Sequence, residues 1–424
     1  MNVNKLLMLF LSICLLSMSF STTAIATEQA TMSKGAYLAK VGNCSTCHTQ
    51  AYGKPFAGGY KMKTPVGAIF STNITPDKST GIGNYTLEDF TNAMRKGFAK
   101  DGHDLYPAMP YPSYTKINNE DIEALYAYFM NEVEPVTQAN KKSEIPWPLN
   151  MRWPLKIWKF FFLEDARYQE KPQQTASWNR GAYLTQGLGH CGACHTPRGI
   201  AFQEKALDEK SKDYLNGGEL DGWSATNLAN DFNTGLKRWS LSDIIVYLKS
   251  GANAYSASFG TMTEVINNST QYYRNEDLSA MAEYLKTLPE TGDKGQTEYI
   301  YDYAETKTAF KNLTENKGAK IYDQYCASCH GRDGKGVAPY LSPLAGNPAV
   351  LDPNASSLIN VTLNGSHHRR TQGVTAPYYM PKFRDSLNDK EVAAVVNFMR
   401  DSWNHKLGTI KESEVSKIRE LSSH

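Results

Sequence analysis

The sequence predicts an all-α protein made of three tandem units of similar plan. Three observations lead to this class: a short motif of two cysteines and a histidine occurs three times, a glycine-containing helical segment precedes each motif, and an amphipathic helical segment closes each unit. Between these ends each unit shows irregular loops and one middle helix, so no strands are expected.

The opening helices are the first shared element. Each contains a Gly-Ala pair eight to ten residues before the first cysteine of its motif, in the segments Gly35-Ala36-Tyr37-Leu38, Gly181-Ala182-Tyr183-Leu184 and Gly318-Ala319-Lys320-Ile321-Tyr322. Because glycine has no side chain, a second helix can approach its backbone closely. We expect that helix to be the closing one, which offers Tyr128, Tyr284 or Phe398 to cover the glycine.

The closing helices show apolar residues at helical spacing behind an asparagine that can cap the helix. The asparagines are Asn118, Asn275 and Asn388, and the apolar positions include Ile122, Leu125 and Phe129, then Leu278, Met281 and Leu285, then Val392, Val396 and Met399. The first two units also share a loop sequence, Thr72-Asn73-Ile74 and Thr226-Asn227-Leu228. The repeated order of elements therefore defines the architecture.

The N-terminus has the form of a secretory signal peptide. Lys5 precedes an apolar run over residues 6–20, and Ala24-Ile25-Ala26 supplies small residues for cleavage before Thr27. An uncleaved single anchor is the alternative, but the run is shorter than the roughly 20 residues that span a bilayer. Cys14 would leave with this leader, so the mature chain keeps six of the seven cysteines.

These features divide the chain into a signal peptide at 1–26, unit one at 27–134, a linker rich in proline and aromatic residues at 135–175, unit two at 176–289, an acidic linker at 290–312, unit three at 313–404 and a polar tail at 405–424. His405 and His424 are expected to be exposed tail residues. The formal charge of +2 falls by one when Lys5 is removed, and this near-neutrality gives no support to nucleic-acid binding.

All six remaining cysteines lie in motifs of the form Cys-x-x-Cys-His. The motifs are Cys44-Ser45-Thr46-Cys47-His48, Cys191-Gly192-Ala193-Cys194-His195 and Cys326-Ala327-Ser328-Cys329-His330. In such a motif the two thiols add to the vinyl groups of a haem, and the adjacent imidazole binds the iron. A redox-active cysteine pair and half of a zinc site are the competing interpretations. A zinc site would need further ligands, and no cysteine is left over.

The second axial ligand decides whether a haem transfers electrons or carries out chemistry on a substrate. A methionine thioether stabilises Fe(II) and raises the reduction potential. Met109, Met262 and Met380 each precede a closing helix, and a proline follows the first and the third. We expect these three methionines to bind iron opposite the motif histidines. His103 is the rival ligand in unit one, and His190 is expected near a haem edge rather than on iron.

The segment from Trp147 to Leu163 alternates two faces. Its apolar face comprises Trp153, Trp158, Phe161 and Phe162, and its basic face comprises Arg152, Lys156 and Lys159. An interfacial membrane helix has this pattern, and so has a strap packed on neighbouring units or on a partner subunit. Packing of the apolar face, with the basic face in water, is our expectation.

The whole arrangement resembles a known family. Three Cys-x-x-Cys-His units in this order are similar to the trihaem cytochrome c subunit of bacterial membrane-bound dehydrogenases, as are the segments Thr72-Asn73-Ile74-Thr75-Pro76-Asp77, Thr80-Gly81-Ile82-Gly83, Met109-Pro110-Tyr111 and Trp147-Pro148-Leu149-Asn150-Met151-Arg152-Trp153. That family includes the partners of quinoprotein alcohol dehydrogenase and of flavin-dependent gluconate, sorbitol and fructose dehydrogenases. Each unit resembles class I cytochrome c, in which the first and last helices cross.

The resemblance implies three covalently bound haems c, no catalytic residues and no nucleic acid. The attachment residues would be Cys44, Cys47, Cys191, Cys194, Cys326 and Cys329, and the axial ligands His48, Met109, His195, Met262, His330 and Met380. Electrons would leave a PQQ or FAD site on a separate catalytic subunit, pass through the haems, and reach ubiquinone or a terminal oxidase. This chain would lie in the periplasm, attached peripherally to the outer face of the cytoplasmic membrane. Trp403-Asn404-His405 departs from the family's Trp-Gly-Asn, which leaves the mode of attachment open.

Two alternatives differ in function from this electron-transfer subunit. A free periplasmic carrier would shuttle between soluble partners and would not dock to a dehydrogenase. A multihaem peroxidase would be an enzyme in its own right, and it would need a vacant or displaceable sixth site on one iron. Every unit has a methionine for that position, which disfavours the peroxidase.

Overall fold

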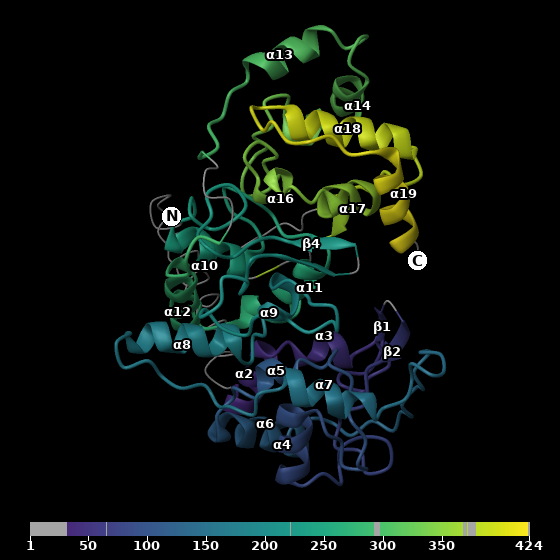
Figure 1. The fold of residues 1–424 in the computed structure, drawn as a ribbon, viewed down its shortest axis with the longest axis vertical. Helices are drawn as coiled ribbons and strands as arrows, with labels where there is room; N and C mark the ends of the chain where they lie inside the picture. The colour runs from purple at the N-terminus through teal and green to yellow at the C-terminus, as the bar shows by residue number, and fades with distance from the viewer. Residues whose placement is uncertain are drawn as a thin grey trace, which may run out of the picture.

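The computed structural model describes residues 32–64, 66–220, 222–291, 297–367, 371 and 379–422. The expected signal peptide and His424 lie outside these residues. The described chain forms an elongated body with the N-terminal helices at one end, the C-terminal helices at the other, and the middle of the chain between them (Figure 1).

The helices fall into three consecutive groups, which we call units one, two and three. Unit one contains α2 (Lys34–Val41), α3 (Cys44–His48), β1 (Lys61–Thr64), β2 (Gly67–Phe70), α4 (Leu87–Lys96), α5 (Tyr111–Tyr114) and α6 (Asn119–Asn131). The linker helix α7 (Pro154–Phe162) follows. Unit two contains α8 (Ala176–Gln186), α9 (Gly192–His195), β3 (Gly218–Leu220), β4 (Trp223–Ala225), α10 (Leu241–Ser250), α11 (Thr261–Asn268), the 3₁₀ turn η1 (Thr270–Tyr272) and α12 (Asn275–Lys286). After α13 (Ala304–Lys311), unit three contains α14 (Lys317–Tyr325), α15 (Ala327–His330), α16 (Pro348–Leu351), α17 (Ser356–Asn364), β5 (Ser366–His367), β6 (Tyr379–Met380), α18 (Asp389–Asp401) and α19 (Glu412–Leu421).

The three antiparallel hairpins differ from the expected plan without strands. β1 pairs with β2, β3 with β4, and β5 with β6. Their strands are two to four residues long, too short for an alternating pattern to identify them in a sequence. The largely helical character that the sequence predicted is otherwise confirmed for the described residues.

The expected crossing of the first and last helices is found in every unit. α2 packs on α6, α8 on α12, and α14 on α18. A Cβ atom added to the opening glycine would lie 2.1 Å from the carbonyl oxygen of Ala124 in unit one, 2.0 Å from that of Ala280 in unit two and 2.4 Å from that of Ala394 in unit three. Only glycine allows this approach, so Gly35, Gly181 and Gly318 are required by packing. Tyr128, Tyr284 and Phe398 lie against the three glycines as predicted.

The caps of the closing helices match the prediction in two units. The side chains of Asn118 and Asn388 accept from backbone N–H groups in the first turns of α6 and α18. In unit two the prediction of Asn275 is wrong, because Arg274 occupies the cap position and its side chain makes no capping bond. The backbone N–H of Arg274 donates instead to the hydroxyl of Tyr37 in unit one, 3.2 Å away.

That contact belongs to a pair of equivalent contacts between units one and two. The hydroxyl of Tyr37 donates to Asp277 at the start of α12 (2.5 Å), and the hydroxyl of Tyr183 donates to Asp121 at the start of α6 (2.7 Å). The Tyr183 hydroxyl also accepts from the backbone N–H of Asn118 at 3.2 Å. Each unit therefore contributes one tyrosine hydroxyl and one aspartate carboxylate to the contact, as in an isologous interface.

The buried apolar side chains form two clusters. One cluster extends through units one and two and includes Leu38, Leu125, Leu184 and Leu285. The other belongs to unit three and is built around Trp403. The first two units thus share one core, and the third has its own.

The C-terminal segment does not form the expected polar tail. Helix α19 packs on α17 and α18 and buries Val415 and Ile418. His405 is buried as well: its Nε2 accepts from the backbone N–H of Gly346 at 2.9 Å, and its Nδ1 donates to the carbonyl of Met399 at 2.7 Å. The prediction of a polar tail was wrong because the few apolar residues of α19, which is mainly polar, lie on one face of the helix.

The linker helix α7 is oriented differently from the prediction. Trp158 and Phe162 are half-buried, but Trp153 and Phe161 are exposed and Lys159 is turned inward. The physical reason is Asp104, a buried carboxylate in unit one that binds the lysine. Among the described residues, every helix is too short or too polar to span a bilayer.

Candidate haem sites

Each motif folds as one short helical turn that follows the opening helix of its unit within a few residues. The motif helices are α3, α9 and α15, and each ends on its histidine. The two cysteines are separated by three positions, so they lie on the same side of the turn. All six thiols are free of disulfides.

The three motif histidines make the same hydrogen bond. Nδ1 of His48 lies 2.7 Å from the carbonyl oxygen of Thr72, that of His195 lies 2.7 Å from the carbonyl of Thr226, and that of His330 lies 2.8 Å from the carbonyl of Ser342. Because a carbonyl only accepts, Nδ1 carries the proton and Nε2 keeps a free lone pair. Metal-binding histidines are oriented in this way. Burial lowers the pKa of all three imidazoles, which favours the neutral form that binds a metal.

The carbonyl acceptors are held by loops that the hairpins and buried asparagines position. Strands β2 and β4 lead almost directly into Thr72 and Thr226. The next residue in each loop is buried: the Asn73 amide donates to the carbonyl of Val136 at 2.7 Å, and the Asn227 side chain accepts from the backbone N–H of Ala229 at 2.6 Å. The Thr-Asn pair shared by units one and two was the sequence signal for this carbonyl acceptor, but its role was not predicted.

Unit three reaches the same geometry with other residues. Ser342 replaces the threonine, and the side-chain amide of Asn347 donates to the carbonyl of Pro343 at 2.9 Å. No Thr-Asn pair occurs in unit three, so no sequence pattern indicates the carbonyl that accepts from His330.

The cysteines do not have the environment of a redox-active pair. Burial raises the pKa of Cys44, Cys191 and Cys326 to about 12. Reactive cysteine pairs instead lower the pKa of one thiol, because the thiolate is the nucleophile. A zinc site has no support either, since no group of three or more possible metal ligands occurs among the described residues. Both competing interpretations of the motifs are therefore disfavoured.

The predicted methionine ligands border the cores of their units. Met109 and Met262 are half-buried against the core shared by units one and two. Met262 is the second residue of helix α11 rather than part of a loop. Met380 is half-buried in β6, opposite Ser366 of β5. Their binding to iron stays a prediction.

Buried polar atoms without partners occur in every unit. Among the described residues no partner exists for the hydroxyl of Tyr106, the indole N–H of Trp239, the side-chain amide of Asn267 or the hydroxyl of Ser366. Tyr106 stands three residues before Met109, Asn267 lies on the helix of Met262, and Ser366 pairs with Met380. Buried polar groups are nearly always hydrogen-bonded. A haem, whose propionates accept hydrogen bonds, fits these unpaired groups.

His103 and His190, the two other histidines considered as iron ligands, have different surroundings. His103 is exposed and pairs with Asp101 on the surface. His190 is half-buried, its Nδ1 donates to the carbonyl of Leu188, and its ring meets the edge of Tyr114 at 5.6 Å. Tyr114 is in turn buried beside the first motif, since its hydroxyl approaches the carbonyl of Gly42. The pair Tyr114–His190 therefore lies between the first and second motifs.

Helix α11 of unit two also contacts the first motif. It begins next to Met262, and at its other end the amide of Asn268 donates to the hydroxyl of Thr46 in the first motif at 3.0 Å. One helix thus carries the candidate ligand of unit two and contacts the motif of unit one.

Comparison with known proteins agrees with this geometry. A cytochrome c family profile matches residues 32–132 and 315–403. The gluconate 2-dehydrogenase cytochrome c subunit of Pantoea cypripedii is 46% identical over 410 residues, which cover 95% of this chain and 93% of that protein. The chain belongs to the family of dehydrogenase cytochrome c subunits.

Two further members of this family show similar likeness. The cytochrome c subunit of the quinone alcohol dehydrogenase of Gluconacetobacter polyoxogenes is 47% identical over 398 residues, covering 93% of this chain and 85% of that protein. Its counterpart from Gluconobacter oxydans (strain 621H) is 44% identical over 413 residues, covering 96% and 86%. Membership of the cytochrome c family implies covalently bound haem c.

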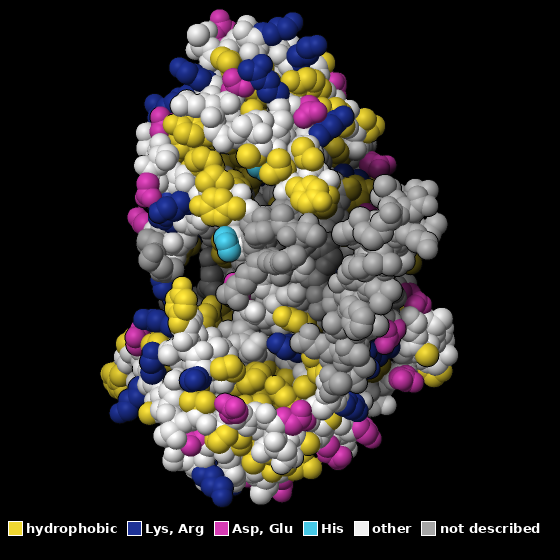
Figure 2. Space-filling view, turned by 180° about the vertical axis from the view of Figure 1, so that it is seen from behind, with side chains coloured by type: hydrophobic (Ala, Val, Ile, Leu, Met, Phe, Trp, Pro, Cys, Tyr) yellow, Lys and Arg dark blue, Asp and Glu magenta, His cyan; other side chains and the backbone are white. Residues whose placement is uncertain are grey.

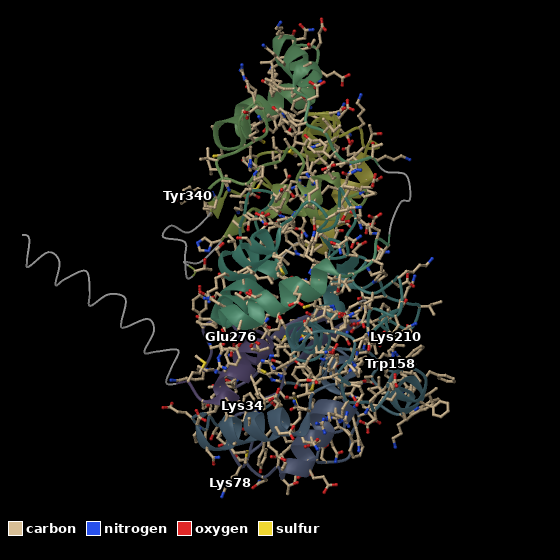
Figure 3. All side chains as sticks on the ribbon, turned by 90° about the vertical axis from the view of Figure 1, so that its left-hand side faces the viewer. Lys34, Lys78, Trp158, Lys210, Glu276 and Tyr340 are labelled. Atoms are coloured by element: carbon tan, nitrogen blue, oxygen red, sulfur yellow. The ribbon has the colours of Figure 1, made fainter. Side chains whose placement is uncertain are left out.

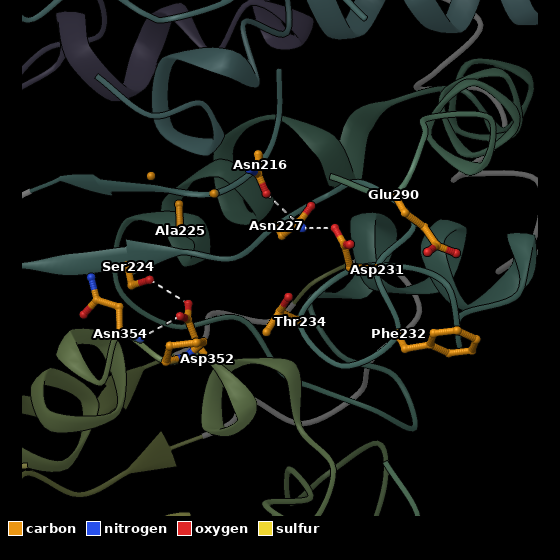
Figure 4. A pocket seen from close by; sticks show the side chains of 13 residues that line it. Asn216, Ser224, Ala225, Asn227, Asp231, Phe232, Thr234, Glu290, Asp352 and Asn354 are labelled. Carbon is orange, nitrogen blue, oxygen red and sulfur yellow. Dashed lines mark hydrogen bonds between the residues drawn. The ribbon is translucent and has the colours of Figure 1, made fainter. Parts of the chain in front are cut away.

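One pocket of this cytochrome c subunit lies between units two and three (Figure 4). Its polar lining includes Asn216, Asn227 and Asp231 from unit two and Asp352 from unit three, and the hydroxyl of Ser224 donates to Asp352 at 2.8 Å. None of the motif cysteines, motif histidines or candidate methionines lines it. The pocket is therefore a gap in the polar contact between the units and not a haem site.

Proposed function

We propose that this chain carries three covalently bound haems c, one in each unit, and that its work is electron transfer. The observation that carries the proposal is the histidine geometry, because His48, His195 and His330 each donate Nδ1–H to a backbone carbonyl and keep Nε2 free. The unpaired buried polar groups in all three units support the same conclusion.

The residues of the chain have distinct roles in this proposal. The cysteines of each motif would hold a haem by thioether bonds, and the carbonyl bond fixes the ring plane of the motif histidine. Met109, Met262 and Met380 would supply the second iron ligands and favour the reduced state. The bound haem supplies a one-electron couple between Fe(III) and Fe(II). The protein supplies the ligands and a partly buried environment for each site.

The proposed electron donor is the catalytic subunit of a dehydrogenase with PQQ or FAD, and the acceptor is ubiquinone or a terminal oxidase. The support is that the relatives are cytochrome c subunits of gluconate and alcohol dehydrogenases. The leader at residues 1–26 and the haem motifs favour a periplasmic location, with attachment to the outer face of the cytoplasmic membrane. The three units are proposed as three domains, the third extending through α19.

A haem count and a redox titration test the electron-transfer proposal. We expect three haems per chain, and each of Met109→Ala, Met262→Ala and Met380→Ala should lower the midpoint potential of one haem and leave the other two nearly unchanged. Met62→Ala is the control, because Met62 lies on strand β1 and does not precede a closing helix. Two haems per chain, or a titration unaffected by a methionine variant, would refute the corresponding assignment.

Co-purification tests the partner. A subunit of a membrane-bound dehydrogenase should remain in the membrane fraction together with its catalytic partner. A free carrier would appear wholly in the soluble fraction, and that result would favour the alternative of a periplasmic shuttle.

A further inference from the structure

The linker helix α7 is attached to the protein through its polar side. Nζ of Lys159 donates to Asp104 at 2.7 Å and to the carbonyl of Gly97 at 2.6 Å. Lys159 is 13% exposed and Asp104 is 6% exposed, so this ion pair is shielded from water. The indole N–H of Trp158 donates to the carbonyl of Ala201 in unit two at 2.8 Å. These contacts orient the helix on the surface of units one and two.

The opposite side of α7 is apolar and exposed. Trp153, Ile157, Phe160 and Phe161 follow one another at the spacing of one helical face, and Phe160 and Phe161 are 82% and 69% exposed. Trp147 before the helix and Ile200 beside Ala201 are also exposed. We call these six residues the α7 apolar surface. Full burial of a side chain of this size is favourable by about 1.5–3 kcal/mol, so an exposed group of them indicates an interaction site.

The segment that carries most of this surface has basic but no acidic side chains. From Ile145 to Leu163 the chain contains no aspartate or glutamate, and of its basic residues Arg152, Lys156 and Lys159 the last is paired with Asp104. Lys156 is exposed next to the apolar stripe, and Arg198 lies two residues before Ile200. On the face of the molecule seen in Figure 2, by contrast, acidic and basic side chains are intermixed. The α7 apolar surface is therefore suited to a negatively charged partner that accepts aromatic side chains.

We propose that the α7 apolar surface inserts into the interfacial region of an anionic phospholipid bilayer, with α7 lying parallel to the membrane plane. Trp and Phe are favoured at the level of the headgroups, and a lysine at the rim can reach lipid phosphates. The inference deepens the proposed membrane location by naming the surface responsible for it. The ion pair Lys159–Asp104 and the bond from Trp158 keep the helix fixed, so little order has to be gained on binding.

Vesicle co-sedimentation of the haem-loaded protein tests this proposal. The protein should bind vesicles of phosphatidylcholine mixed with phosphatidylglycerol and bind more weakly to phosphatidylcholine alone. The double variant Phe160→Ser/Phe161→Ser should reduce the partition coefficient by about tenfold or more, because binding scales with the apolar area inserted. Lys156→Glu should reduce binding to the anionic vesicles selectively, and this loss should disappear at high salt.

Matched controls lie elsewhere on the molecule. Ile300 is 71% exposed and Tyr340 is 51% exposed, and both belong to the part of the chain near unit three. In Figure 3 Tyr340 lies on the side opposite Trp158. The double variant Ile300→Ser/Tyr340→Ser removes exposed apolar area of similar kind and should bind vesicles as the parent protein does.

Two results would overturn the proposal. The first is equal vesicle binding by the parent protein and the Phe160/Phe161 variant. The second is loss of the dehydrogenase subunit on co-purification of that variant while vesicle binding is kept, which would make α7 a docking site for the partner subunit. The haem spectrum and haem content of each variant report separately on the electron-transfer proposal, so failure of one inference is distinguishable from failure of the other.

Discussion

Units one and two form a fused pair, and unit three is joined to that pair by a different kind of contact. The pair shares one apolar core and the two Tyr–Asp contacts. Unit three has its own core, and it has Lys320 at the position of Tyr37 and Tyr183. It meets unit two through polar bonds, such as the hydroxyl of Ser357 accepting from the backbone N–H of Ser224 at 2.9 Å.

Units built on the same pair of crossed helices are therefore joined in two different ways. A shared apolar core makes two units one cooperative structure, since neither can lose its packing without exposing the other. A polar contact that includes a pocket resembles an interface between domains, which can open or shift independently. We therefore expect the pair to unfold as one unit and unit three to unfold separately.

Substitution of the opening glycines should have the largest effect on the stability of the units. Gly181→Val would force a side chain against the carbonyl of Ala280, at a cost above the roughly 1–3 kcal/mol of ordinary overpacking, because a backbone must move. We expect it to destabilise units one and two together. Gly318→Val should destabilise unit three alone and leave a protected fragment that carries two haems.

Limited proteolysis with haem detection in the fragments measures this difference. Gly408→Ala is the control, because nothing lies within 4 Å of a Cβ atom at that glycine. Protection of unit one in the Gly181→Val variant would contradict a shared cooperative core.

A half-buried carboxyl group of unit two gives the next largest effect, and it depends on pH. Burial raises the pKa of Glu204, which packs against Gly192 of the second motif, to about 7. In the unfolded chain the pKa is near 4.3, so between these values the folded protein holds a proton that the unfolded chain has lost. Stability should therefore fall as pH rises through this range and stay low above it.

The variant Glu204→Gln should remove this pH dependence. At about pH 8 it should be more stable than the parent by as much as about 3 kcal/mol, since one pKa unit is worth about 1.4 kcal/mol, and near pH 4 the two should be equal. Urea unfolding of the haem-loaded proteins in one oxidation state measures the difference. In unit three the carboxylate of Asp323 pairs with the exposed Arg332, and Asp323→Asn should change stability little at any pH.

The Tyr–Asp contacts should have equal and moderate effects. Tyr37→Phe and Tyr183→Phe each remove one donor from a buried carboxylate, which should cost about 1–2 kcal/mol. The unfolding midpoint of the pair should shift to lower urea by the same amount in both variants, and Tyr340→Phe on the surface should leave it unchanged. Clearly unequal shifts would show that the two contacts are not equivalent.

The smallest expected effect concerns an ion pair that occurs once in each unit. Arg180 makes two bonds to Asp277, at 2.7 and 2.9 Å, whereas in unit three the exposed Lys317 lies 3.5 Å from the half-buried Glu391. Lys317→Ala should cost less than about 0.5 kcal/mol. Arg180→Ala should cost more, because it leaves a buried carboxylate without its cation. Equal losses in urea unfolding would mean that burial of Asp277 is unimportant.

Much of the fold and the candidate site could be predicted from the sequence. The opening glycines, the aromatic residues that cover them and two of the three caps depend on local patterns, and the structure places them as expected. The motif histidines are likewise set by local spacing. Ligation by the three methionines stays a prediction, because the structure shows their positions and not their bonds.

The remaining features depend on partners far along the chain. No local pattern indicates that Lys159 binds Asp104, 55 residues away, and this one pair reverses the orientation of α7. The docking of α19 and the burial of His405 depend in the same way on the surface of α17 and α18. The carbonyl of Ser342 was not predicted as an acceptor, because every residue has a backbone carbonyl and the residue type does not indicate which one is used.

The symmetry of the Tyr–Asp contacts also bears on the evolutionary origin of the chain. A single ancestral unit with both the tyrosine and the carboxylate would already complement a second copy of itself. Duplication and fusion of such a unit would turn an intermolecular dimer into an intramolecular one, and the linker that contains α7 would then be free to acquire other interactions. Unit three, with a lysine in place of the tyrosine, cannot take part in this self-pairing. Of the three units, the first two alone keep the signature of an internal homodimer.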